Sequence, residues 1–563
     1  MIRFYSLFEP FRKAFSFCIN KINNNNALAL LIIFLCTIFI KLYFIQLGTI
    51  TTDEGYYLSY SQNLKEALFY TPRDYNFYYT ALVGHFFLKM FSAKLLGLRI
   101  LQILNYLFLF YIIFKFLNKK IPNICIVLGT IFSLLTICSI RPLSFYYDDL
   151  SVTLCILSMY FLFKGTENGK NYQLIISGFI LGASIFARSP NIVYAVLLGY
   201  PLLSSGNLKE GFRRFSFCIA GFFIGIASSL LVIHSYGSLE GLAEGLNSIY
   251  NASHSEDDRH NLLTIFLYMF GQLKAILITS LKYMLFFVPA YFFSERNKTL
   301  KIIFSLFFVA FLIKSIHTFY VLPETIMAYY LSWITCALLY IFITKKEQRV
   351  NMLFLFAGQY IIAFGSDHYL RVSLAFIYSG LTVCMIFYIL YLEKKKLTNA
   401  FIALYTIVLF AAVFTRSFSP NTSPFISAHT IGEMKHPVSN CDMLAYTKTD
   451  SASAKECEYF MSVIKPKLKS HSVLIGNTGD IKHVVHMYKN VYNGWPKDWG
   501  TNESVYKSII STYKKNKEKP DVLLRKEDMK DCNCPEMRFM KEVGNYRMVW
   551  EDKTYKLFVP KTK

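Results

Sequence analysis

Long apolar runs alternate with short polar segments along the first 415 residues, and this alternation predicts helices that span a membrane. A helix needs about 20 apolar residues to cross the hydrocarbon core, so the shorter runs must borrow neighbouring residues at their ends. The thirteen runs that could span are residues 27–48, 99–117, 121–140, 149–163, 173–187, 191–205, 213–234, 272–293, 300–318, 326–344, 350–364, 372–392 and 399–415.

A further apolar stretch, residues 75–91, is predicted to lie along the membrane surface. It is rich in aromatic residues but contains His85 and Lys89, and Lys94 follows closely. Counting it as a crossing would move every later basic cluster to the opposite side of the membrane. We therefore expect an interfacial helix at this position.

The basic residues between the runs predict the orientation of the chain, because short loops rich in Lys and Arg stay in the cytoplasm. With a cytoplasmic N-terminus, every basic cluster falls on the cytoplasmic side and the C-terminal tail on the other. The clusters are Lys119-Lys120, Arg213-Arg214, Arg296 with Lys298, Lys345-Lys346 with Arg349, and Lys394–Lys396. The outer loops are then residues 48–98, 141–148, 188–190, 235–271, 319–325 and 365–371.

The tail differs from the rest of the chain in composition, since Lys, Asp, Glu, Asn and Ser dominate it. Its short apolar stretches Ser472–Gly476 and Val522–Leu524 predict buried strands, and Ala454–Ile464 predicts an amphipathic helix. The expected fold is a polytopic α-helical membrane protein with a small extracytoplasmic α/β domain. Its parts are a cytoplasmic segment at 1–26, a membrane domain at 27–415 with a catalytic first outer loop at 48–98, and a soluble periplasmic domain at 416–563.

The composition of the 563 residues supports this class, since 54% are apolar and only 17% are charged. Intrinsic disorder and a plain soluble enzyme are excluded, because one or two soluble cores cannot hide so much apolar surface. The basic loops that keep the chain oriented in the membrane account for most of the net charge of +23. Anionic lipid headgroups and phosphate-bearing substrates are the expected partners, and nucleic acid is not.

The tail also contains four cysteines, Cys441, Cys457, Cys532 and Cys534. One or two disulfides could form there if the tail lies outside the cytoplasm. No pair has the spacing of a metal-binding CxxC motif.

Two pairs of adjacent carboxylates lie at outer helix ends, where ionisable groups mark candidate functional sites. Asp53 and Glu54 follow the first run, and the apolar spacing of Tyr57–Leu68 places them just before a short helix. Asp148 and Asp149 open the run at 149–163. Each pair could instead serve only to cap its helix.

Cations stand in three other outer segments. Arg188 precedes Pro190 in a tight turn and suits a phosphate or carboxylate partner, although it could simply extend to the membrane interface. The loop at 251–261 holds His254 and Arg259 and could be ordinary solvated chain. The loop at 365–371 holds His368 and Arg371 and could bind an anion.

Metal binding is a further alternative for the loop at 251–261. His254, Asp258 and His260 could bind a divalent metal, but no spacing pattern supports such a site. We therefore assign no metal ligand and no certain cofactor.

These groups fit a group transfer from a lipid-linked donor. One carboxylate can take a proton from a hydroxyl nucleophile, while cations neutralise a departing phosphate. Neither the GxxxxGK[ST] motif nor a Rossmann fingerprint is present, so the sequence offers no nucleotide cradle. Asp53 is the expected base, and Arg188 and Arg259 are the expected phosphate contacts.

The pattern resembles GT-C glycosyltransferases, above all lipid A aminoarabinose transferases and protein O-mannosyltransferases. The resemblance rests on Asp53-Glu54 followed by Tyr56-Tyr57, on Tyr147-Asp148-Asp149, and on Arg188-Ser189-Pro190. Pro72-Arg73 departs from the Lys-Pro or Pro-Pro pair of the family in residue order. The resemblance implies an inverting single displacement of a sugar from polyprenyl phosphate, with contributions from Tyr56, Tyr57 and Arg73 to substrate binding.

The predicted function is therefore a membrane glycosyltransferase of a bacterial inner membrane, with a lipid, glycan or protein as acceptor. The main alternative is a secondary transporter or a lipid or polysaccharide flippase, which would carry ionisable residues at the membrane midplane within paired repeats. A third alternative is a non-catalytic assembly protein that acts through its outer domain.

Overall fold

The computed structural model is described over most of the chain. The described residues are 14, 16–47, 52–65, 68, 72–91, 93–139, 144–254, 262–293, 297–321, 325–365, 373–393, 396–421, 430–441, 444–469, 473–475, 510, 513–514, 519–526 and 535–561.

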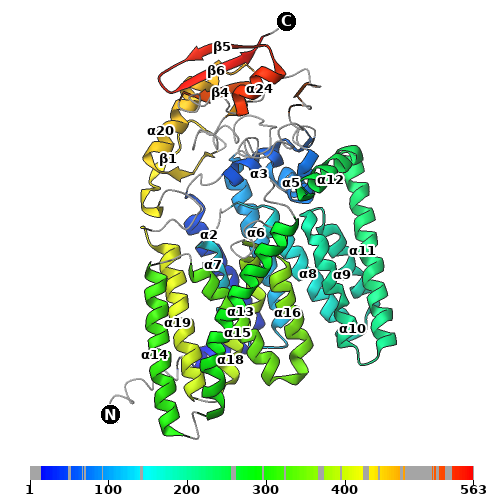
Figure 1. Ribbon diagram of the computed structural model, residues 1–563, viewed down its shortest axis with the longest axis vertical. Helices are drawn as coiled ribbons and strands as arrows, with labels where there is room; N and C mark the ends of the chain where they lie inside the picture. The colour runs from blue at the N-terminus through cyan, green and yellow to red at the C-terminus, as the bar shows by residue number, and fades with distance from the viewer. Residues whose placement is uncertain are drawn as a thin grey trace.

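A bundle of roughly parallel helices forms the body of the protein (Figure 1). Within the described residues, nine helical spans are long and apolar enough to cross a membrane. They lie in α2 (Asn26–Phe44), α6 (Lys94–Leu117), α8 (Tyr147–Asn168), α11 (Leu208–Tyr236), α13 (Leu262–Phe293), α14 (Lys298–Val321), α15 (Thr325–Thr344), the consecutive α17 (Ser373–Thr382) and α18 (Cys384–Leu392), and α19 (Lys396–Phe418).

Shorter helices fill the remaining predicted runs. They are α7 (Asn123–Cys138), α9 (Asn171–Ser184), the 3₁₀ helix η2 (Ser189–Gly199) with α10 (Tyr200–Ser204), and α16 (Arg349–Ile361). Each of the thirteen predicted runs therefore contains a helix. The polytopic helical membrane fold predicted from hydropathy is confirmed.

The structure corrects two details of the runs. α13 begins at Leu262, whereas the hydropathy run starts at residue 272, because Leu262–Phe270 is itself apolar and continues the helix. The run at 191–205 is mostly 3₁₀ helix, with Pro190 in its first turn. A 3₁₀ helix rises about 2.0 Å per residue, so a short run covers more of the membrane thickness.

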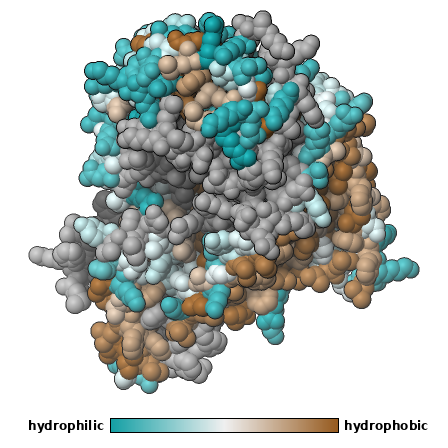
Figure 2. All heavy atoms as spheres, turned by 45° about the horizontal axis from the view of Figure 1, so that its top comes forward, coloured by the Kyte–Doolittle hydropathy of each residue, from teal (hydrophilic) through white to brown (hydrophobic). Residues whose placement is uncertain are grey.

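The surface of the bundle is apolar, as lipid contact requires. Large side chains such as Phe223 (63% exposed), Leu231 (69%) and Leu285 (71%) face outward. Figure 2 shows hydrophobic residues over the helices and mainly hydrophilic residues over the C-terminal domain.

Short helices cover the end of the bundle that faces the C-terminal domain (Figure 1). They are α3 (Thr52–Gln62), η1 (Pro72–Phe77), α5 (Tyr78–Leu88) and α12 (Leu239–His254). The predicted interfacial segment forms η1 and α5, and α5 has 11 residues. At 1.5 Å per residue, such a helix covers about half of the hydrocarbon thickness and cannot cross it.

A close backbone contact joins α9 to α11 through glycines. A Cβ on Gly178 would lie 1.9 Å from the carbonyl oxygen of Cys218, and one on Gly182 would lie 2.1 Å from that of Phe222. Gly221 and Gly225 present the reciprocal contacts from α11. Small residues at such spacing let two backbones meet, and here they fix the helix that leads to Arg188.

The C-terminal domain contains a four-stranded sheet in the order β3 (Val473–Ile475), β4 (Asp521–Arg525), β6 (Tyr555–Pro560) and β5 (Tyr546–Glu551). β3 and β4 run parallel, and the other pairs are antiparallel. Helix α20 (Ser451–Tyr459) continues as a π-helical turn (Phe460–Ile464), and α24 (Pro535–Val543) follows β4. Both predicted strands and the predicted helix are thus present. The remaining short elements are the 3₁₀ turns η3 (Lys346–Gln348), η5 (Ile431–Glu433) and η8 (Lys465–Lys467), and the antiparallel strands β1 (His436–Pro437) and β2 (Lys448–Thr449).

The C-terminal domain shares an apolar core with the helices below it. Leu58 of α3, Leu88 of α5, and Leu95 and Leu98 of α6 are buried in one cluster with residues of the domain. The domain residues of this cluster are Val438, Cys441, Leu444, Cys457, Phe460, Met461, Ile464, Leu523, Tyr555, Leu557 and Val559. Cys532 and Cys534 lie outside the described residues, so disulfide formation in the tail stays a prediction.

Candidate functional site

Aromatic side chains bring the three predicted motifs together at the covered end of the bundle. Tyr57 of α3 stacks on Tyr146 before α8, with ring centroids 5.5 Å apart. Tyr147 stacks on Phe77 of η1 at 4.6 Å. The guanidinium of Arg188 lies 5.9 Å from the ring centroid of Tyr147. The two acidic motifs and the arginine turn therefore line one region.

Glu54 is fixed in a buried ion pair. Its carboxylate accepts hydrogen bonds from Nε and Nη2 of Arg99, at 3.0 and 3.1 Å. The hydroxyl of Ser144, which precedes α8, also donates to this carboxylate. Arg99 and Glu54 are only 1% and 2% exposed. Removal of one partner from such a pair leaves a buried charge and costs about 3–5 kcal/mol.

Asp149 closes the first turn of α8. Tyr146 is the N-cap, and its backbone N–H donates to Asp149 Oδ2 at 3.1 Å. The same oxygen accepts from Gln102 Nε2 at 3.1 Å, and Oδ1 accepts from the Tyr106 hydroxyl at 2.9 Å. Asp149, at the third helical position, thus helps to cap α8. Helix capping was the alternative role considered from the sequence.

Three side chains that donate to these carboxylates lie on one face of α6, and they were not singled out from the sequence. Arg99, Gln102 and Tyr106 are spaced by three and four residues, which aligns them on a helix. Lys41 of α2 donates to Gln102 Oε1 at 2.9 Å and lies 4.5 Å from the ring centroid of Tyr106. Polar residues at helical spacing inside two apolar runs are the signal that could have identified them.

Arg188 is a buried cation whose side chain is incompletely bonded. It is 3% exposed, and its Nη1 has no hydrogen-bond partner among the described residues. The backbone around it is held in place by neighbouring elements. Ser189 N donates to Asn76 Oδ1 at 2.8 Å, and the Thr80 hydroxyl donates to the Ala187 carbonyl at 3.3 Å.

Asp148 and Arg188 both lie near Tyr194 of η2. Both residues are close enough to this tyrosine to interact with it electrostatically, and Asp148 is 1% exposed. Gly365, which follows α16, lies close to this arginine, since a Cβ there would lie 3.5 Å from Arg188 Nη2. The loop that contains His368 and Arg371 begins directly after Gly365, but both residues lie outside the described part.

Tyrosine hydroxyls join the short helices above the bundle. Tyr60 of α3 donates to the Asp74 carbonyl at 2.7 Å, and the backbone N–H of Ser238 donates to the Tyr75 hydroxyl at 2.7 Å. Burial raises the pKa of Tyr60 well above its ordinary value, and the nearby Asp74 carboxylate adds to this. Tyr60 therefore stays protonated and acts as a donor that ties α3 to η1.

Asp53 lies in the first turn of α3, which begins at Thr52. The sequence placed the acidic pair before this helix; the structure places it inside, where carboxylates suit the positive end of the helix dipole. The backbones of Tyr56, Arg73 and His254 belong to α3, η1 and α12. The structure does not describe their side chains or that of Asp53, and it does not describe Arg259 at all.

No group of three or more His, Cys, Asp or Glu that could hold a metal ion occurs among the residues that the structure describes. Asp258 and His260 lie outside that part of the chain. The divalent metal considered from the sequence therefore stays untested.

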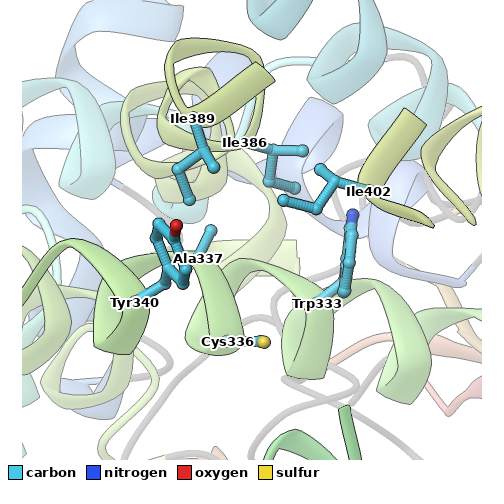
Figure 3. Close-up of a pocket in the computed structure, with 7 residues that line it drawn as sticks. All are labelled: Trp333, Cys336, Ala337, Tyr340, Ile386, Ile389 and Ile402. Atoms are coloured by element: carbon cyan, nitrogen blue, oxygen red, sulfur yellow. The ribbon is translucent and has the colours of Figure 1, made fainter. Parts of the chain in front are cut away.

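A separate, small apolar pocket lies between α15, α18 and α19 (Figure 3). Trp333 and Tyr340 of α15 line it together with Ile386, Ile389 and Ile402. Its lining residues carry no charged side chain, so it lacks the groups that phosphate chemistry requires. The candidate site is therefore the polar end of the bundle.

Comparisons with known proteins find a likeness in structure but none in sequence. No protein-family model matches the chain, and no curated protein matches it. Among solved structures, the chain is similar to ArnT from Cupriavidus metallidurans bound to undecaprenyl phosphate, at 10% sequence identity and a TM-score of 0.44, over 94% of this chain and 96% of that one. ArnT is a GT-C lipid A aminoarabinose transferase, the group that the acidic motifs resemble. At this identity and TM-score, the likeness carries no conclusion about function, which must come from the residues of the site.

Proposed function

We propose that the protein is a GT-C-type membrane glycosyltransferase of a bacterial inner membrane. It transfers a sugar from a polyprenyl-phosphate donor to a lipid, glycan or protein acceptor on the outer side. The observation that carries the proposal is Arg188, a buried cation beside the acidic start of α8, whose Nη1 has no hydrogen-bond partner within the described part of the chain. A buried charge is costly unless it is paired, and the guanidinium fork suits phosphate oxygens.

In this proposal the acceptor hydroxyl attacks the anomeric carbon of the sugar in a single displacement. Asp53 takes the hydroxyl proton as the new glycosidic bond forms and the bond to the phosphate oxygen breaks. Arg188 holds the phosphate that leaves on the lipid, and Asp148 orients the acceptor. Glu54 and Asp149 support these groups, since their oxygens already accept hydrogen bonds from Arg99, Gln102 and Tyr106.

Substrate identification comes first in the experimental test. Mass spectrometry of glycolipids and glycans from cells with and without the protein gives the sugar and the acceptor. Transfer is then measured with the purified protein in lipid vesicles that contain the polyprenyl-phosphate sugar.

The decisive variant is Asp53→Asn, which keeps the size of the side chain but removes the basic oxygen. We expect transfer to fall by about 10²-fold or more, because general-base catalysis contributes that much. Glu210→Gln, at the start of α11, is the control and should keep wild-type transfer. Near-normal product formation by Asp53→Asn would refute the assignment.

A further inference from the structure

Three consecutive backbone carbonyls between α2 and α3 accept hydrogen bonds from two different parts of the protein. Arg99 Nη1 donates to the carbonyl of Ile45 at 2.7 Å and to that of Leu47 at 3.2 Å. The carbonyl of Gln46, between them, accepts the backbone N–H of Lys448 at 2.7 Å. Lys448 belongs to β2 of the C-terminal domain, and a parallel bridge pairs it with Leu47. One short segment therefore joins a membrane helix to the outer domain.

The same guanidinium also fixes the acidic motif. Nε and Nη2 of Arg99 donate hydrogen bonds to both carboxylate oxygens of Glu54. Glu54 is next to Asp53 in the first turn of α3. A two-point contact through a planar fork fixes the direction of the carboxylate as well as its position. The orientation of this turn therefore depends on Arg99.

The neighbouring residue of α6 adds apolar contacts in the same direction. Leu98 is buried in the core that α3 and α5 share with the C-terminal domain, and its carbonyl accepts the backbone N–H of Phe145 at 3.2 Å. The first turns of α6 thus contact α3, the residues before α8 and the outer domain together. A shift of the C-terminal domain would therefore move the residues that contact both acidic motifs.

We propose that Arg99 is a positioning residue that couples the docking of the C-terminal domain to the geometry of the acidic motif at Asp53-Glu54. This inference deepens the proposed function and rests on it for the catalytic consequence. Arg99 does not touch the reacting atoms. It acts through Glu54 and through the 45–47 segment, so the outer domain is a structural part of the active site.

The test combines kinetics with hydrogen–deuterium exchange of the full-length protein in lipid nanodiscs. Arg99→Lys keeps the charge but loses the fork. The double variant Arg99→Met with Glu54→Gln removes both charges and leaves no unpaired buried charge. It serves as the second test if the single variant does not fold. The matched control is Lys120→Met with Glu167→Gln, which removes a more exposed ion pair in a different part of the bundle.

We expect kcat of both Arg99 variants to fall on the order of 10- to 100-fold, while KM for the donor changes by less than about threefold. Amide exchange in a peptide that spans residues 444–450 should become about tenfold faster, because the Lys448 N–H loses its ordered acceptor. The control should match the wild type in both measurements.

Two results would overturn the inference: a loss of kcat without faster exchange at 444–450, or faster exchange with normal kcat. Failure of the proposed function is distinguishable from either. If the wild-type protein transfers no sugar from any lipid phosphate, the proposed activity is wrong, while the exchange measurement still reports whether Arg99 controls the docking of the domain.

Discussion

Arg188 and Arg99 show how one residue type serves two purposes at the same end of the bundle. Arg99 directs its nitrogens to a carboxylate and to two carbonyls. Arg188 is equally buried, yet its Nη1 has no acceptor within the described residues. Residues that bind a ligand commonly reduce the stability of the free protein, whereas residues that only hold the fold increase it.

The two arginines should therefore differ in their effect on stability. Arg188→Met should lower transfer by about 10²-fold or more, because a phosphate contact in a dry site is lost. The thermal midpoint of the substrate-free protein should stay unchanged or rise, since an incompletely bonded buried charge is removed. Thermal unfolding in detergent, followed by tryptophan fluorescence, measures this. A large drop in the midpoint would assign Arg188 to the fold instead.

At the scale of elements, the helices were predictable and their polar contacts were not. Hydropathy locates every run because lipid contact demands continuous apolar sequence. By contrast, Arg99 stands at the very start of the run 99–117, where a single cation looks like the end of a helix. Its partner Glu54 is 45 residues away in sequence, and only the packing of α6 against α3 brings them together.

The α9–α11 contact gives a prediction at this scale. Gly178→Ala should destabilise the protein by about 1–3 kcal/mol, because the new methyl group would overlap the Cys218 carbonyl and push the helices apart. Transfer should fall as well, since α9 leads directly to Arg188.

Gly271→Ala in α13 is the matched control. A Cβ at Gly271 meets nothing within 4 Å in the described structure, so this change should be neutral or slightly stabilising. Thermal midpoints of the two variants in the same detergent decide the point. Equal midpoints would contradict close backbone packing of α9 on α11.

At the scale of the whole molecule, the first and the last described segments lie at opposite ends of the molecule (Figure 1). This agrees with the odd number of crossings inferred from the apolar runs. The charge pattern adds the direction, since the basic loops predict a cytoplasmic N-terminus. The shared core between the C-terminal domain and α3, α5 and α6 was not predictable, because apolar residues in a polar tail do not reveal their partners.

The orientation can be tested with reporter fusions. Alkaline phosphatase fused after residue 561 should be active, because this enzyme folds only outside the cytoplasm. The same reporter fused after Lys346, in η3 between two spans, should be inactive. A fluorescent protein that folds only in the cytoplasm should give the reverse pattern. Activity of the phosphatase only at the inner position would invert the proposed topology.

The incomplete hydrogen bonding of the buried Arg188 also has a consequence for the rate of turnover. In the proposed reaction the donor is a phosphodiester with one negative charge, whereas the spent carrier is a monoester with up to two at neutral pH. Arg188 should therefore hold the spent carrier more firmly than the donor it replaces. Departure of the carrier, and not formation of the glycosidic bond, would then be the slowest event of each cycle.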